Sequence, residues 1–116
     1  MKFIIFNWKS YLNFKESISL VKFLAKMKFD KSFKLILAPS NISLGYLNKT
    51  FKNLLFCAQN FDLYGKGGFT SYTSINDIKD QNIKFTIIGH SEVRQYSGEN
   101  DPIVSQKLKI ALGSKI

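Results

Sequence analysis

Short apolar runs alternate along the whole chain with segments whose apolar residues recur at helical spacing. Four runs have the length and the nearly continuous apolar character of buried strands, and they span residues 3–6, 34–38, 54–58 and 85–89. A polar or glycine-containing turn follows each of them. Strands that alternate with helices are typical of parallel sheets. The pattern therefore predicts an α/β fold made of four parallel β-α units.

Helix-capping residues mark the segments between and after these runs. Asn13, with Glu16 three positions later, predicts a capped helix that ends near Lys28. Further helices are expected at residues 42–49, at residues 75–80 behind the cap Ser74, and from the cap Asp101 through Pro102 to a stop at Gly113, with Val104, Leu108 and Ala111 on one face. Residues 60–73 are expected to form a protruding loop.

Length and composition predict one domain over residues 1–116, with 45% hydrophobic residues to form its core. The net charge is +9, but only one of the 17 basic residues is an arginine and the lysines are scattered. Specific nucleic-acid recognition usually relies on arginine, so it is disfavoured. The single Cys57 excludes an intrachain disulfide. No apolar stretch reaches the length of a membrane span or signal peptide, which predicts a cytoplasmic protein without a membrane partner.

The residues that follow the first and fourth runs are the candidates for chemistry. Asn7 and Lys9 follow the first run and His90 follows the fourth, so a parallel sheet would bring them to the same edge. Lysine can balance an anionic substrate, asparagine can orient a hydroxyl or carbonyl group, and a neutral imidazole can donate to a developing oxyanion. Ser91 is expected to cap a short helix whose dipole disfavours imidazolium at His90.

Other kinds of site are poorly supported. A lone histidine at a strand end is more often structural than catalytic, and a lysine after a strand is usually only solvated. One histidine and one cysteine in separate segments give no metal-ligand cluster. The glycines between Gly65 and Gly68 do not match a dinucleotide-binding motif. We therefore expect neither a metal nor a cofactor.

A series of short motifs follows the four runs in a fixed order. They are Asn7-Trp8-Lys9, Ala38-Pro39-Ser40, Ala58-Gln59-Asn60, Gly68-Phe69-Thr70, Ile87-Ile88-Gly89-His90-Ser91-Glu92 and Gly98-Glu99. In this order they resemble the amino-terminal half of the triosephosphate isomerase family, and the resemblance covers essentially the whole chain. It implies half of a TIM (β/α)8 barrel and the interconversion of glyceraldehyde 3-phosphate and dihydroxyacetone phosphate in glycolysis and gluconeogenesis.

The resemblance also implies roles for individual residues. Asn7 and Lys9 would bind the triose phosphate, and His90 would be the electrophile that polarises its carbonyl group during enediolate formation. The pairing of a glutamate base with a neutral histidine is the standard description of this enzyme. Glu92 would be the acidic neighbour that organises the site, with Ser91 beside it.

The loop residue Thr70 would enter the neighbouring subunit of the family's homodimer, and Lys107 matches a family lysine in the last helix. Two departures affect the same regions. The family's Gly-Glu after Phe-Thr is Ser71-Tyr72 here, and the first arginine after its His-Ser-Glu is Val93. Both changes call normal dimerisation into question.

Length is the larger departure, since a barrel of this type has eight strands and about 250 residues. The family's catalytic glutamate lies after strand six, and neither Glu16, Glu92 nor Glu99 matches it. We therefore expect a truncated half-barrel that is inactive alone. It would act as an isomerase with a complementing carboxyl-terminal half chain, or be a catalytically inactive remnant or assembly module.

Overall fold

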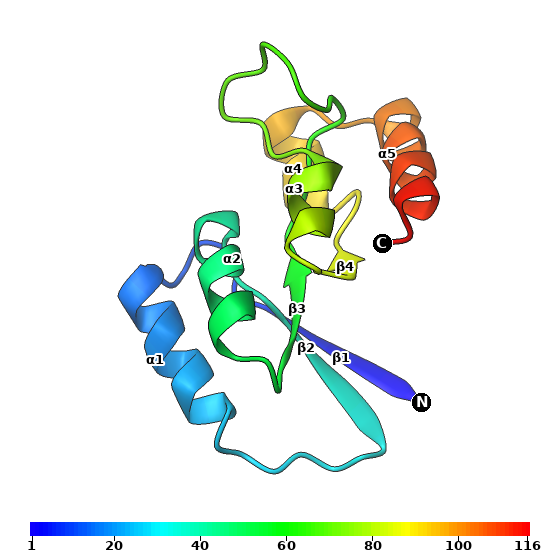
Figure 1. Ribbon diagram of the computed structural model, residues 1–116. Coiled ribbons are helices and arrows are strands. Elements are labelled where there is room, and N and C mark those ends of the chain that lie inside the picture. Colours follow the sequence, from blue (N-terminus) through cyan, green and yellow to red (C-terminus); the bar gives the residue numbers. More distant parts are fainter. The chain divides into compact units, whose positions relative to one another are not determined.

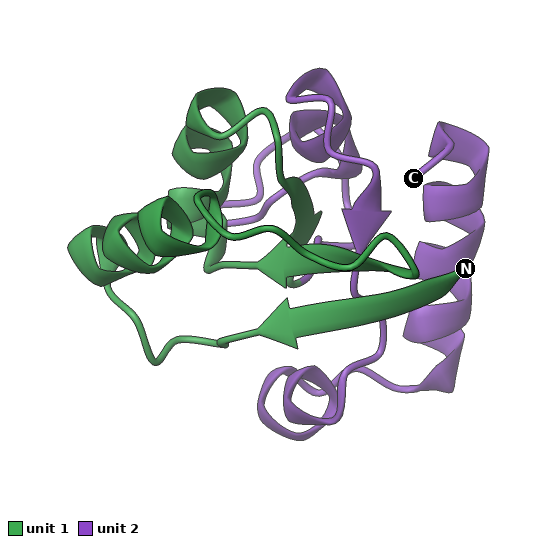
Figure 2. Cartoon of the chain, turned by 90° about the horizontal axis from the view of Figure 1, so that it is seen from below, with its two compact units in different colours: residues 1–59 green, residues 60–116 purple.

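The computed structural model describes residues 1–116, which form four strands and five helices. Their contacts divide the chain into two compact units, Met1–Gln59 and Asn60–Ile116, which Figure 2 shows in different colours. Each unit is described by itself below. The expectation of a single domain over residues 1–116 stays a prediction.

The first unit holds three parallel strands and two helices (Figure 1). The strands are β1 (Lys2–Asn7), β2 (Phe33–Ala38) and β3 (Leu55–Ala58), and β2 pairs with both of the others. The helices α1 (Phe14–Leu24) and α2 (Asn41–Thr50) connect them. The predicted alternation of strands and helices is confirmed for this part of the chain, within one or two residues at most element ends.

Apolar side chains near the carboxyl ends of β2 and β3 form the core of the first unit. They pack with one face of each helix, and the buried set comprises Val21, Leu24, Ile36, Leu37, Ala38, Leu44, Leu47, Phe56, Cys57 and Ala58. Burial of one leucine side chain stabilises a fold by roughly 1.5–3 kcal/mol. The ends of β2 and β3, and the residues that follow them, are thus the firmly held part of this unit.

Helix α1 begins as predicted and ends earlier than predicted. Asn13 Oδ1 accepts a hydrogen bond from Glu16 N at 3.0 Å, and Glu16 Oε2 accepts one from Asn13 N at 2.8 Å, which completes a capping box. The helix ends at Leu24, before Lys28. Beyond it, Lys26 N and Met27 N bond to carbonyl groups only three residues back, so the chain tightens out of α-helical geometry.

Strand β1 is exposed to an unusual degree for an apolar strand. Its four central residues, Phe3, Ile4, Ile5 and Phe6, are between 41% and 56% exposed. They point alternately to the two faces of the sheet, and β1 pairs along one edge with β2. Open apolar edges favour association with another strand.

The second unit contains β4 (Phe85–Thr86) and the helices α3 (Ile75–Asp80), α4 (Ser91–Ser97) and α5 (Asp101–Ser114) (Figure 1). Helix α3 has the predicted bounds, and Ser74 and Asp77 form its capping box. The buried apolar residues in and near α3 are Ile75, Ile78 and Ile83. Helix α5 contacts α3 and contributes the buried Ala111.

Two predicted elements of the second unit differ from the structure. Strand β4 ends at Thr86, because residues 87–89 make no strand pairing, so the predicted run to Gly89 is wrong. Helix α5 is capped by Asn100, whose Oδ1 accepts from Ile103 N, and it continues through Gly113 to Ser114. Its predicted face is also wrong at Leu108, which is 50% exposed, since the neighbouring Lys107 is buried instead.

Residues 60–73 form a loop without helix or strand, as predicted. Two hydrogen bonds close its base: Asp62 N donates to the Thr73 carbonyl at 2.8 Å, and Asp62 Oδ2 accepts from Thr73 N at 2.5 Å. Above the base, the rings of Tyr64, Phe69 and Tyr72 stack, and Tyr64 and Phe69 have centroids 4.7 Å apart. The loop therefore carries a small aromatic cluster of its own.

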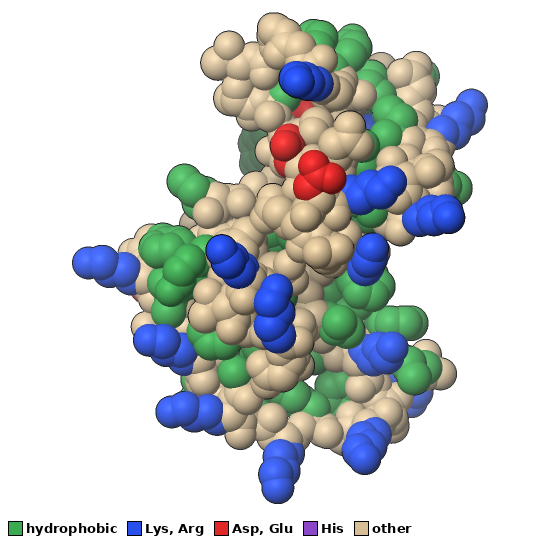
Figure 3. All heavy atoms as spheres, in the orientation of Figure 1, with side chains coloured by type: hydrophobic (Ala, Val, Ile, Leu, Met, Phe, Trp, Pro, Cys, Tyr) green, Lys and Arg blue, Asp and Glu red, His purple; other side chains and the backbone are tan.

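Basic side chains stand separately over the face of the molecule drawn in Figure 3, and none of them merges into a continuous patch there. This distribution agrees with the scattered lysines of the sequence. None of the helices combines the length and the apolar character needed to cross a membrane.

Candidate functional site

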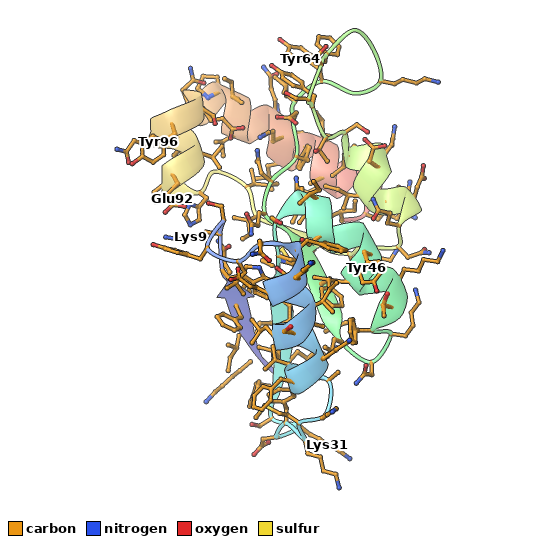
Figure 4. All side chains as sticks on the ribbon, turned by 90° about the vertical axis from the view of Figure 1, so that its left-hand side faces the viewer. Lys9, Lys31, Tyr46, Tyr64, Glu92 and Tyr96 are labelled. Atoms are coloured by element: carbon orange, nitrogen blue, oxygen red, sulfur yellow. The ribbon has the colours of Figure 1, made fainter.

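The first part of the site is the turn that follows β1. Asn7 Oδ1 accepts a hydrogen bond from Lys9 N at 2.8 Å. Lys9 has a φ of 55°, in the left-handed region that residues other than glycine rarely adopt. Figure 4 shows Lys9 on this turn and Lys31 at the opposite end of the first unit. Since such a backbone persists only when its surroundings hold it, the turn is a candidate functional element.

Gln59 is the side chain that holds this turn. Its Nε2 donates to the Lys9 carbonyl oxygen at 2.8 Å and to the Ala38 carbonyl oxygen at 2.9 Å. One amide group thereby ties the turn after β1 to the end of β2. The sequence analysis placed Gln59 in a motif without a role; its position directly after β3 was the available signal, because parallel strands end at one edge.

Trp8 anchors the same turn from inside. It is 5% exposed and meets the Phe6 ring edge-on, with centroids 5.8 Å apart. The residues on either side of Trp8 are thereby left at the surface of the turn, and Lys9 is partly exposed. Asn7, the last residue of β1, and Lys9 thus lie together in the first unit, and the predicted common edge with His90 stays a prediction.

The second part of the site is His90, which is the N-cap of α4. Its Nδ1 accepts a hydrogen bond from Glu92 N at 3.2 Å. Ser91 is the first residue of the helix, so its predicted capping role is wrong. Because Nδ1 is the acceptor, the neutral ring carries its proton on Nε2. His90 can therefore present an N–H donor to a ligand.

Glu92 lies beside this ring, with its Oε2 3.7 Å from His90 Nδ1. That distance is beyond hydrogen-bond length. The lone pair of Nδ1 is directed to the main-chain N–H, so the carboxylate contributes a nearby negative charge. Both side chains are partly exposed, and Figure 4 shows Glu92 at the beginning of α4.

The turn before His90 needs a glycine for two reasons. Gly89 has a φ of 69°, and a Cβ at this position would lie 3.0 Å from Val104 Cγ1 of α5. Arg94 Nε donates to the Gly89 carbonyl at 3.0 Å, and Arg94 Nη1 pairs with Asp101 Oδ1 at 2.7 Å. Helices α4 and α5 thus fix the backbone that carries His90, a positioning role of Arg94 that the sequence analysis missed.

Lys107 of α5 is only 1% exposed. Its Nζ donates to Asn60 Oδ1 at 2.9 Å and pairs with Glu99 Oε1, and it lies 5.4 Å from the centre of the Phe61 ring. A buried ammonium is tolerated only when it is paired in this way. Lys107, which the sequence matched to a family lysine, therefore forms a structural ion pair within the second unit.

The structure thus brings Asn7 and Lys9 together in the first unit, and His90, Ser91 and Glu92 together in the second. Thr70 is exposed in the loop of residues 60–73. No three His, Cys, Asp or Glu side chains are grouped so that they could hold a metal ion. The first unit thus offers a lysine-bearing turn, and the second offers an imidazole N–H donor at His90.

Comparison with known proteins gives a consistent result. The family model for triosephosphate isomerase matches residues 2–116. The triosephosphate isomerase of Buchnera aphidicola subsp. Baizongia pistaciae is 36% identical over 99% of this chain and 48% of its own length. Those of Thermoanaerobacter pseudethanolicus and Mycoplasma genitalium are 34% and 32% identical, over 91% and 92% of this chain and 44% of each relative.

The chain therefore spans about half the length of the curated relatives it matches. Its four β-α units and the family match together confirm the predicted fold class, α/β with the first four units of a TIM (β/α)8 barrel. On this evidence, the chain belongs to the triosephosphate isomerase family.

Proposed function

We propose that this chain supplies the substrate-binding and electrophilic half of a triosephosphate isomerase. In this proposal Asn7 and Lys9 bind the triose phosphate, and His90 polarises its carbonyl group while an enediolate forms. Glu92 and Ser91 support the histidine, and Thr70 serves contact with another subunit. The reaction is the interconversion of glyceraldehyde 3-phosphate and dihydroxyacetone phosphate, in the cytoplasm.

One observation carries the proposal most directly: the hydrogen bond from Glu92 N to His90 Nδ1. It leaves the proton of the neutral ring on Nε2, which is the donor that a developing oxyanion requires. A neutral donor stabilises negative charge as it forms without itself requiring a counter-charge. The Lys9 ammonium supports the proposal on the substrate side, because a triose phosphate is an anion at neutral pH.

The proton-abstracting base would come from outside these 116 residues. Glu16 caps α1, Glu99 pairs with the buried Lys107, and Glu92 adjoins His90. None of these three carboxylates matches the family's catalytic glutamate, which lies after strand six. We therefore propose that a carboxyl-terminal half, as a further segment or as a separate chain, supplies the glutamate and the closing loop.

The exposure of β1 supports association with such a half. Four consecutive apolar residues and one open strand edge would be covered by a further strand and its helix. A second copy of this chain is the other partner that we consider, as in the homodimers of the family.

The test is a reconstitution. The chain is mixed with a polypeptide that comprises the unmatched carboxyl-terminal half of the Buchnera relative, and isomerisation of glyceraldehyde 3-phosphate is followed in a coupled assay. We expect activity only when both are present, and a loss of about 10²–10³-fold in kcat for His90→Gln. If the halves associate in sedimentation experiments and still give no isomerisation, the proposal is wrong.

A second candidate is a catalytically inactive remnant or assembly module. The engagement of all three glutamates favours it for this chain alone, as do the family departures at Tyr72 and Val93. It predicts association with a carboxyl-terminal half, or self-association, without turnover. Isomerase activity of the purified chain by itself would refute it.

A further inference from the structure

The second unit contains a cavity that the proposed reaction does not use. It has a volume of about 330 Å³ and lies between the long loop and the segment that joins α4 to α5, with Asp62, Tyr64, Tyr72 and Glu99 among its lining residues. That volume is within the range of small-molecule sites, roughly 300–1,000 Å³. Because all of its lining residues belong to the second unit, the cavity is a property of that unit.

The Glu99 carboxylate is the most informative group in this cavity. Its side chain is only 10% exposed, and while Oε1 pairs with Lys107, Oε2 is buried and receives no hydrogen bond. A buried carboxylate oxygen without a donor is costly, so such groups usually have a partner. The Glu99 carboxylate therefore keeps the capacity to accept a further hydrogen bond.

The charge around the cavity favours a positively charged donor. Two of the chain's eight acidic residues, Asp62 and Glu99, line it, and no Lys, Arg or His does. Lys107 already balances Glu99, so Asp62 leaves one uncompensated negative charge. The net charge of +9 acts at long range, but salt screens charges beyond about 8 Å at physiological ionic strength. The nearby carboxylates of Asp62 and Glu99 therefore favour a ligand with a positive charge.

Two tyrosine rings that line the cavity favour a flat cation over a compact one. The Tyr64 and Tyr72 rings are nearly parallel, at 10° with centroids 6.3 Å apart; Phe69 stacks against both, and the two tyrosines are half exposed. Figure 4 shows Tyr64 at the loop. A planar guanidinium stacks on tyrosine faces and bonds carboxylates through several N–H groups, whereas a compact ammonium offers no flat surface. A metal ion lacks the three clustered ligands that it needs.

We propose that this cavity binds a guanidinium group, with Asp62 and Glu99 Oε2 as acceptors and Tyr64 and Tyr72 as the flat walls. The chemistry is the same for a free guanidino compound and for an arginine side chain. The site is independent of His90 and of isomerase activity, so each proposal can fail without the other.

The test is an NMR titration of the 116-residue chain with L-arginine amide and, as a counterpart of the same shape with an uncharged side chain, L-citrulline amide. We expect shifts at residues 62–64, 72 and 97–99 with arginine amide, and at least tenfold weaker binding of citrulline amide. A Gly-Arg-Gly peptide that binds more tightly than arginine amide would identify a protein side chain as the ligand; equal affinities would identify a free compound. Equal shifts with citrulline amide, or no shifts at all, would overturn the proposal.

Two variants locate the binding. Asp62→Asn keeps an acceptor for Thr73 N and removes the charge, so binding should weaken at least fivefold. Asp80→Asn makes the same charge change on α3, outside this cavity, and should leave binding unchanged. If Asp62→Asn loosens the loop, Tyr72→Ala tests the aromatic wall instead. Equal effects of the Asp62 and Asp80 substitutions, or unchanged binding by the Tyr72 variant, would contradict the assignment.

Discussion

Gln59 Nε2 donates a hydrogen bond to the carbonyl oxygen of Lys9 across 50 positions of sequence, at 2.8 Å. The same nitrogen reaches the end of β2 at Ala38. The left-handed backbone of Lys9 is therefore held by a side chain from the end of β3, in addition to its local bond with Asn7. The left-handed backbone at Lys9 is thus held by hydrogen bonds both within the turn and from the end of β3.

Gln59→Ala should lower the free energy of unfolding by about 1–3 kcal/mol, because it removes both of these partly buried hydrogen bonds. Urea denaturation measures the change. Gln81→Ala is the matched control: Gln81 Nε2 donates to the Asp77 carbonyl at an exposed helix end, and its loss should cost less than about 0.5 kcal/mol. Equal effects of the two substitutions would mean that Gln59 does not hold the turn.

Ser71→Gly should stabilise the chain. Ser71 has a φ of 66°, where a Cβ costs roughly 1–2 kcal/mol, partly offset by the greater backbone entropy of glycine, so a gain of about 0.5–1 kcal/mol is expected. Ser74→Gly is the control, and here the free energy of unfolding should fall, because Ser74 has an ordinary backbone conformation and caps α3. It should destabilise by a few tenths of a kcal/mol or more. A fall in stability with Ser71→Gly would show that its hydroxyl outweighs the strain.

The elements that sequence predicted best are those with local signals. The α3 helix has its cap and its acidic partner within four residues, so Ser74 and Asp77 predict its beginning without tertiary information. Strand β4 is the opposite case. Its residues are apolar throughout, but strand length depends on pairing with a distant segment, which the residues themselves do not encode.

The residues of the candidate site also divide into those with a local sequence signal and those whose position depends on distant residues. Asn7 and Lys9 could be grouped from sequence because they stand two positions apart at the end of one apolar run. The cap at His90 could not be predicted, since serine is the commoner capping residue and stands next to it. Lys107 was predicted only through the family resemblance. A lysine is ordinarily exposed, and its burial depends on Glu99 and Asn60, which lie 8 and 47 positions away.

Cys57 should be unreactive in the folded chain. Burial raises the pKa of its thiol to about 12 from about 9, and the thiolate is the reactive form. Between these values the unfolded chain loses a proton that the folded chain keeps, so the free energy of unfolding falls as pH rises, by up to about 1.4 kcal/mol per pH unit.

The Cys57 prediction is measured by reaction with an aromatic disulfide reagent at pH 8, which should be slow in buffer and fast in urea. Cys57→Ala, compared with the unaltered chain in urea denaturation between pH 9 and 12, should lose less stability as the pH rises, since the two chains differ only at this thiol. Identical pH profiles would contradict the assigned burial.

Gly89 and Gly98 offer a matched pair of alanine substitutions at one backbone conformation. Both have a φ of 69°, but a Cβ at Gly89 would meet Val104 at 3.0 Å, whereas nothing lies within 4 Å of one at Gly98. Gly98→Ala should therefore cost only the backbone penalty, about 1–2 kcal/mol. Gly89→Ala should cost about 1–3 kcal/mol more, because the clash is added.

The difference between these two variants, measured by urea denaturation, isolates the packing of the His90 turn against α5. Gly89→Ala combined with Val104→Ala should cost less than the sum of the single changes, because the second removes the atom that the first would strike. If Gly89→Ala and Gly98→Ala cost the same and the double variant is additive, the Val104 side chain of α5 does not restrain the turn that carries His90.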